Sequence, residues 1–133
     1  MATMIDELQS ELRQFTGTEN YYRHWMNSRF VYTDGVRYLA EKAGAHWLLD
    51  LIFSHQAEII RRSLDDPRYR MEFQVWRVQH DGNGGCRVYC DDGDGLEMAS
   101  QDVPFTDFPE LENFRLYLVH DRAKVCLYLP SEH

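Results

Sequence analysis

The sequence predicts an α+β fold in which N-terminal helices pack on one face of a four-stranded antiparallel β-meander. Helical periodicity dominates the first half of the 133 residues, and strand-like runs separated by turn residues dominate the second half. Asp65-Asp66-Pro67 marks the boundary, because proline disfavours helix in the residue before it. We therefore expect a single domain, 1–133, with a helical half at about 4–64 and a sheet half at about 70–130.

Two helices are predicted near the N-terminus. The first is indicated by four apolar residues at helical spacing, Ile5, Leu8, Leu12 and Phe15. The aromatic residues Tyr21, Tyr22 and Trp25 then predict a short helix that ends near Trp25.

The stretch Tyr32–Gln56 carries the strongest helical pattern in the chain. Its apolar stripe rotates by roughly a quarter turn past Gly44, which a single straight helix would not do. Two helices, about 34–43 and 45–61, with a break at Gly44 explain the change. The second is apolar on nearly all sides, so we expect it to be the buried centre of the protein.

The sheet half contains four strand-like runs, Arg70–His80, Cys86–Asp91, Phe114–His120 and Lys124–Leu129. The glycine-rich turn 81–85 joins the first two runs into a hairpin, and 121–123 joins the last two. Between the hairpins we expect a loop over roughly 92–113.

Alternation along the four strands assigns their side chains to two faces. The expected core set is Phe73, Val75, Val88, Leu116, Leu118, Val125, Leu127 and Leu129. The opposite face would carry Trp76, Val78, Tyr89, Tyr117, Val119 and Tyr128. Four aromatic residues exceed what a solvated face requires. Either the 92–113 loop or the N-terminal helix covers this face, or it forms a partner or homodimer surface.

Charge is distributed unevenly along the chain, whose net charge is −8. Residues 1–70 hold nine basic and ten acidic residues, a balance of −1, and residues 71–133 hold five and twelve, a balance of −7. Eight of those acids fall in one stretch without a base: Asp91, Asp92, Asp94, Glu97, Asp102, Asp107, Glu110 and Glu112. This asymmetry argues against direct nucleic-acid binding. The acids either only keep the protein soluble or contact a basic protein or nucleoprotein surface.

No motif in the sequence identifies an enzyme or a metal site. With Gly95 at position 6 of a calcium-binding EF-hand loop, the end positions become Cys90 and Gln101 instead of acids. His46 and Asp50 share a helix face, but two candidate ligands do not make a metal site. Nucleophile and phosphate-binding motifs are absent from the sequence, so we expect no cofactor, no metal and no catalytic residue.

The cysteines and the N-terminus predict a cytoplasmic protein. Cys86 and Cys90 lie four residues apart in a predicted strand, too far apart for a disulfide, and with Cys126 they make an odd count. No apolar run approaches the ~18 residues that a membrane span needs. The first residues are acidic where a signal peptide would be basic.

Four stretches of the chain resemble an uncharacterised family of small bacterial proteins. They are FTGTENYYRHW, YTDGVRYLAEKAGAHWLLDLIFSHQ, VPFTDFP and the closing LYLPSEH. The family is defined as a domain of unknown function, and its members often sit on phages, plasmids and other mobile elements. The resemblance implies a bacterial context and assigns no catalytic residues.

Two functions from different classes remain. The first is a non-enzymatic, acidic protein-binding module, such as an anti-CRISPR-like inhibitor of a bacterial defence complex, that covers a basic nucleic-acid-binding surface. Its contacts would come from residues 91–112 and the aromatic sheet face. The alternative is a small enzyme or ligand-binding domain with a site near His46, Asp50 and Tyr22.

Overall fold

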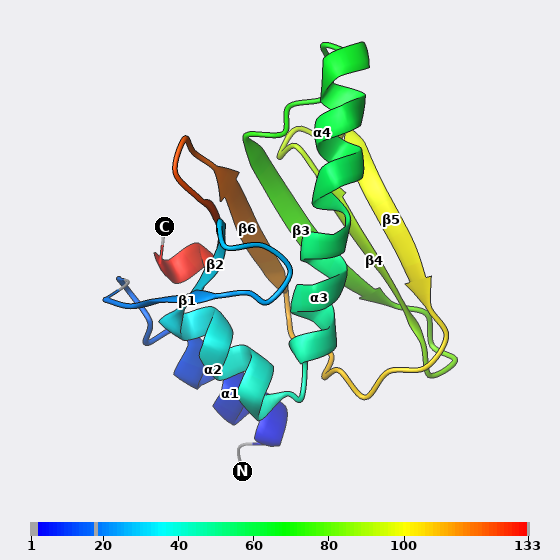
Figure 1. Cartoon of the computed structure of the whole chain (residues 1–133). Helices are drawn as coiled ribbons and strands as arrows, with labels where there is room; N and C mark the ends of the chain where they lie inside the picture. Colours follow the sequence, from blue (N-terminus) through cyan, green and yellow to red (C-terminus); the bar gives the residue numbers. More distant parts are fainter. Residues whose placement is uncertain (1–2, 18, 133) are drawn as a thin grey trace.

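The computed structural model describes residues 3–17 and 19–132 (Figure 1). The helices are α1 (Met4–Leu12), α2 (Asp34–Lys42), α3 (His46–Ser54), α4 (Gln56–Asp65) and a short 3-10 turn, η1 (Pro130–Glu132). The strands are β1 (Tyr21–Arg23), β2 (Phe30–Thr33), β3 (Phe73–His80), β4 (Cys86–Asp91), β5 (Glu97–Val103), β6 (Arg115–His120) and β7 (Val125–Tyr128). Within the described ranges, no helix is long and apolar enough to cross a membrane.

The strands form one seven-stranded mixed sheet in the order β1-β2-β7-β6-β3-β4-β5. Neighbouring strands are antiparallel except for β2 and β7, which are parallel. The prediction of a four-stranded antiparallel meander is therefore wrong, although the fold class remains α+β. Strands β3, β4 and β5 are successive neighbours, and β6 returns to the free side of β3 in a Greek-key arrangement.

The strands that the sequence did not reveal are β1, β2 and β5. Tyr21 and Tyr22 lie in β1, where a short helix was predicted, and β1 pairs with β2 along Tyr22↔Tyr32. Strand β5 lies inside the predicted 92–113 loop and pairs with β4 from Cys86↔Val103 to Asp91↔Glu97. Its residues, EMASQDV, include few strong strand formers, so backbone pairing to β4 decides its conformation.

The helix break at Gly44 is confirmed, because this residue has the left-handed φ of +60° that glycine tolerates best. The predicted helix 45–61 is wrong in one respect, since it divides into α3 and α4 at His55. The Ser54 hydroxyl donates to the carbonyl of Leu51 at 2.6 Å, an interaction that bends helices. Helix α3 is central as expected, with Leu48, Leu49 and Ile52 at most 1% exposed.

Helices α3 and α4 lie across one face of the sheet (Figure 1). This inner face carries Trp76, Cys90 and Leu116 in one cross-strand row. The predicted placement of β3 is therefore out of phase by one residue. Trp76 faces the helices at 1% exposure, whereas Phe73 and Val75 lie on the opposite face, where Val75 is still only 3% exposed. The sequence does not reveal the phase because Val75 and Trp76 are adjacent and both apolar.

A buried polar network fixes the position of α4 on the sheet. The side-chain amides of Gln56 and Gln74 bond each other in both directions, at 3.0 and 2.9 Å. Trp76 Nε1 donates to Gln74 Oε1 at 2.9 Å, and His120 Nε2 donates to Gln56 Oε1 at 2.9 Å. Burial, with a smaller contribution from the charge of Arg29, lowers the pKa of His120 below its ordinary value. Network partners satisfy these polar groups, and the network links α4 with β3 and β6.

Candidate functional site

The eight predicted acids do not form one uniform surface. Asp91, Asp92, Asp94 and Glu97 lie at the β4–β5 turn, whereas Asp102, Asp107, Glu110 and Glu112 follow at the other end of β5 and beyond. We call the first set the turn acids and residues 102–112 the acidic segment. Seven residues of extended chain separate the two ends of β5, which amounts to roughly 20 Å.

Two of the turn acids hold local structure together. Asp91 is 9% exposed, and Arg77 Nε donates to its Oδ2 at 3.1 Å. The other oxygen of Asp91 accepts from the backbone N–H of Gly93 at 2.8 Å. Asp92 Oδ1 accepts from the backbone N–H groups of Asp94 and Leu96, at 2.8 and 3.2 Å. These carboxylates therefore shape the turn and are poorly placed to meet a partner.

Glu97 is also engaged, because it forms an ion pair with Arg87 on the neighbouring strand. Asp94 is exposed at the tip of the turn. Two of the turn acids, Asp92 and Asp94, are therefore free of ion pairs within the described residues, and only Asp94 is fully exposed.

Two hydrogen bonds and the packing of one buried ring hold the acidic segment to the body of the protein. The backbone N–H of Thr106 donates to the Gly84 carbonyl at 2.8 Å, and His80 Nε2 donates to the Phe108 carbonyl at 2.7 Å. The Phe108 side chain is 3% exposed and meets the Trp47 ring edge-on, with centroids 6.3 Å apart. This part of the Greek-key connection crosses beneath the ends of the strands (Figure 1).

The outward side of the same segment is acidic and carries one large apolar residue. Phe105 is 85% exposed and lies between two exposed acids, Asp102 and Asp107. Glu110 and Glu112 are exposed as well. Across the part of the chain that the structure describes, none of these four carboxylates forms an ion pair. Pro104 and Pro109 restrict the backbone on both sides of Thr106.

Sequence reasoning did not single out the exposed Phe105, nor Phe108 and His80, which hold the segment to the body of the protein. A signal was present in VPFTDFP, where prolines flank the alternation of Phe105, Thr106, Asp107 and Phe108. That alternation becomes exposed, half-buried, exposed and buried in the structure. The sequence did not indicate which side of the predicted loop would face the rest of the protein. It therefore did not indicate which phenylalanine would turn inward.

The predicted aromatic contact residues separate into two groups. Trp76 lies in the core, so it is corrected from a surface position to a structural one. Tyr89, Tyr117 and Tyr128 are half-buried, and the strand register places them on the outer sheet face. The rings of Tyr117 and Tyr128 meet edge-on at 5.7 Å, and burial raises the pKa of Tyr128 to about 12. Within the 92–113 region, the Phe108 ring packs against Trp47 of helix α3, on the helical side of the sheet and not over these tyrosines.

The residues of the alternative site have separate local partners. Tyr22 donates to Asp34 Oδ1 at 2.8 Å. Asp50 Oδ1 accepts from His24 Nε2 at 2.6 Å and from Trp25 Nε1 at 2.9 Å. His24 Nδ1 accepts the Met26 N–H at 3.3 Å, which assigns the ring proton to Nε2. His46 is exposed and, among the described residues, forms no hydrogen bond or ion pair with Asp50. Asp50 therefore serves to position His24 and Trp25.

The cysteines are buried and unbridged, as the sequence predicted. Burial raises the pKa of the Cys90 thiol to about 12 and that of Cys126 to about 11. Such thiols remain protonated near neutral pH and are poor nucleophiles.

Fold and site together define a small α+β protein with a Greek-key connection that presents unpaired carboxylates and one exposed phenylalanine. The chain belongs to a family of unknown function, DUF6876, whose model matches residues 6–133. Neither the curated proteins nor the solved structures contain a significant match.

Proposed function

We propose that the protein is a non-enzymatic binding protein whose acidic segment covers a basic surface on another protein. The observation that carries this proposal is the contrast within residues 102–112. Their inward side chains and backbone are fixed by bonds and packing, whereas Asp102, Asp107, Glu110 and Glu112 are exposed without ion pairs among the described residues. A fixed row of free carboxylates is suited to recognise a complementary set of lysines and arginines.

Phe105 supports this proposal through its position, because Met4 and Leu64 are about as exposed but do not lie among free carboxylates of the acidic segment. It is 85% exposed, and it lies among acids. Aromatic residues at the centre of an interface contribute much of its binding energy, and surrounding polar groups exclude water and set specificity. Phe105 would enter an apolar gap in the partner surface while the acids bind its basic rim.

The rigidity of the segment favours binding. Flexible loops lose conformational entropy when they are ordered at an interface, which weakens association. Here Pro104 and Pro109 limit the unbound conformations, and the Phe108 side chain is already packed in the core. Little further ordering is needed when a partner arrives.

The partner class follows from the charge. Surfaces with many lysines and arginines in the cell commonly serve nucleic-acid binding, since phosphates provide the complementary charge. An acidic protein that occupies such a surface prevents nucleic acid from binding there. The proposal therefore includes inhibition of a nucleoprotein complex, and the resemblance to proteins of mobile elements favours a bacterial defence complex as the target.

The proposal is tested by affinity capture from a bacterial lysate with wild-type protein and with Asp107→Lys/Glu110→Lys. Wild type should retain a basic protein at about 0.05 M salt and lose most of it at about 0.5 M, where surface charges are screened. The double variant should retain about tenfold less, because two attractive contacts become repulsive. Phe105→Ala should also weaken capture, with little change in its salt dependence.

The matched control is Glu7→Lys/Glu72→Lys, which changes the net charge equally at exposed positions outside the acidic segment. It should capture the partner nearly as wild type does. Equal losses in both double variants would assign the effect to overall charge, and undiminished capture by Asp107→Lys/Glu110→Lys would refute the proposed surface.

A further inference from the structure

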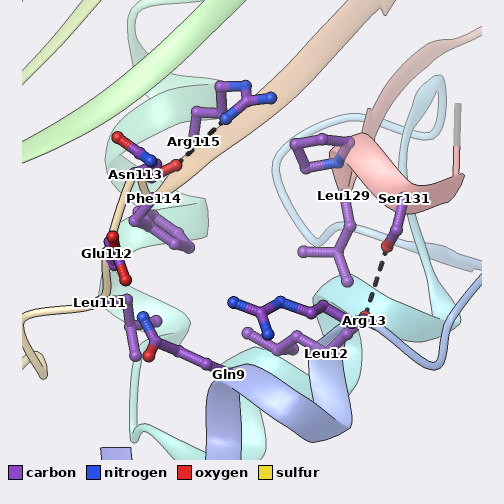
Figure 2. A pocket seen from close by; sticks show the side chains of 11 residues that line it. Gln9, Leu12, Arg13, Leu111, Glu112, Asn113, Phe114, Arg115, Leu129 and Ser131 are labelled. Atoms are coloured by element: carbon purple, nitrogen blue, oxygen red, sulfur yellow. Dashed lines mark hydrogen bonds between the residues drawn. The ribbon is translucent and has the colours of Figure 1, made fainter. Parts of the chain in front are cut away.

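A second feature of the molecule has the opposite charge character. A groove of about 370 Å³ lies between the end of α1, the start of β6 and the C-terminal turn η1 (Figure 2). Its apolar lining includes Leu12, Leu111, Phe114 and Leu129. Leu12 and Leu129 are largely buried in the protein, with exposed fractions of 9% and 3%. The volume lies at the lower end of the range for small-molecule sites.

Two arginines border this groove without carboxylate partners. Arg13 is exposed, and its side chain extends over the groove from the end of α1 (Figure 2). Arg115 donates only to neutral oxygens, those of the Tyr117 hydroxyl at 3.1 Å and the Asn113 carbonyl at 3.2 Å. Neither guanidinium forms an ion pair within the described residues. Several other basic residues also lack ion pairs, so the relevant observation is that these two guanidinium groups border the same groove, where they suit an anionic ligand.

The backbone at the groove is also unusual. Asn113 has a φ of +52°, the only positive φ at a non-glycine residue in the described part of the chain. Asparagine tolerates this left-handed conformation better than most residues. The Asn113 carbonyl is the acceptor for Arg115, so the strained residue helps to hold the guanidinium at the rim.

The remaining polar groups narrow the ligand class. Glu112 lines the groove and repels every negative charge near it, so the repulsion is smallest for a ligand with a single charge. The Ser131 hydroxyl is already used, because it donates to the Leu12 carbonyl at 3.3 Å. A single anionic head with an apolar body fits this arrangement better than a phosphate or a dicarboxylate does.

We propose that this groove binds a small apolar monocarboxylate, with its carboxylate between Arg13 and Arg115 and its apolar body on Leu12, Phe114 and Leu129. The groove borders the end of the acidic segment through Leu111 and Glu112, but Arg13 and Arg115 lie outside that segment. This site makes the protein able to bind a ligand of the fatty-acid or aromatic-acid class in addition to a protein partner.

The experiment is an NMR titration of the full chain with octanoate, with octanol as the uncharged probe of equal length. Octanoate should shift the amide signals of residues lining the groove in a saturable manner and bind about tenfold more tightly than octanol. Arg13→Gln should weaken octanoate binding by about tenfold and leave octanol binding unchanged. Arg115→Gln should do the same, and Arg122→Gln, outside the groove, should have no effect.

Several results would overturn the proposal. They include the absence of saturable shifts at the groove, equal affinity for octanoate and octanol, and unchanged octanoate affinity in Arg13→Gln. Binding of a short peptide that ends in leucine, without binding of octanoate, would also overturn it and assign the groove to a protein C-terminus. The variant Asp107→Lys/Glu110→Lys should bind octanoate as wild type does, so failure of either proposal leaves the other testable.

Discussion

The acids at the two ends of β5 have different roles, although they belong to one run of the sequence. At the β4–β5 turn, Asp91 and Asp92 accept hydrogen bonds from the neighbouring backbone, and Asp91 and Glu97 pair with arginines. In the acidic segment, Asp107 and Glu110 are exposed without ion pairs among the described residues. The difference shows that a charge run alone does not define a binding surface, because the carboxylates that stabilise the fold must be separated from those that remain available.

The largest expected effect distinguishes the two phenylalanines of the acidic segment. Phe108→Ala should lower the free energy of unfolding by about 3–5 kcal/mol, because it removes a buried ring from the core. Phe105→Ala should change it by less than about 0.5 kcal/mol, because that ring is exposed. Urea unfolding followed by circular dichroism measures both. Equal destabilisation would contradict the inward and outward sides assigned to the segment.

The next effect separates the two sets of acids. Asp91→Asn should lower the free energy of unfolding by about 1–3 kcal/mol, because it weakens a largely buried pair whose partner, Arg77, is partly exposed. The matched change Asp107→Asn should leave stability within about 0.5 kcal/mol of wild type. Denaturation midpoints of both variants check this. A stability loss at Asp107 equal to that at Asp91 would remove the distinction between the sets.

The smallest effect concerns the pH dependence of stability, and it tests the burial of His120 on the inner face of the sheet. The lowered pKa of His120 means that the folded state resists protonation more than the unfolded state does. Its contribution to stability is therefore complete above about pH 6.5 and is lost as the pH falls toward the folded-state pKa. The loss of stability between about pH 7 and 5.5 should be smaller in His120→Gln, and carboxylates titrate mainly below this window. An identical pH dependence in the variant would contradict the role of His120.

The local sequence pattern was sufficient to predict the helix break and the two hairpins. The break at Gly44 follows from the rotation of the apolar stripe, and the β3–β4 and β6–β7 hairpins follow from turn residues between apolar runs. The order of the hairpins in the sheet does not follow from local pattern. It depends on the crossing of the connection beneath the sheet and on the parallel pairing of β2 with β7, which joins residues nearly a hundred positions apart.

The sequence located the acidic residues but did not indicate which of them are held in local hydrogen bonds. In the structure, Asp91 and Asp92 accept hydrogen bonds from the backbone of the turn, and sequence spacing cannot reveal such bonds. The adjacent apolar pair Val75 and Trp76 left the phase of β3 undetermined, so Trp76 was assigned to the wrong face. Phe105 could be distinguished from Phe108 only once the direction of the connection was known.

The central claim is that the acidic segment competes with nucleic acid for one surface of its partner. The most direct measurement is the fluorescence anisotropy of a labelled oligonucleotide bound to the captured partner, titrated with this protein. We predict that the anisotropy falls to the value of the free oligonucleotide, and that Asp107→Lys/Glu110→Lys requires about tenfold more protein for the same decrease. An anisotropy that stays constant or rises, as in a complex of all three molecules, would contradict the claim.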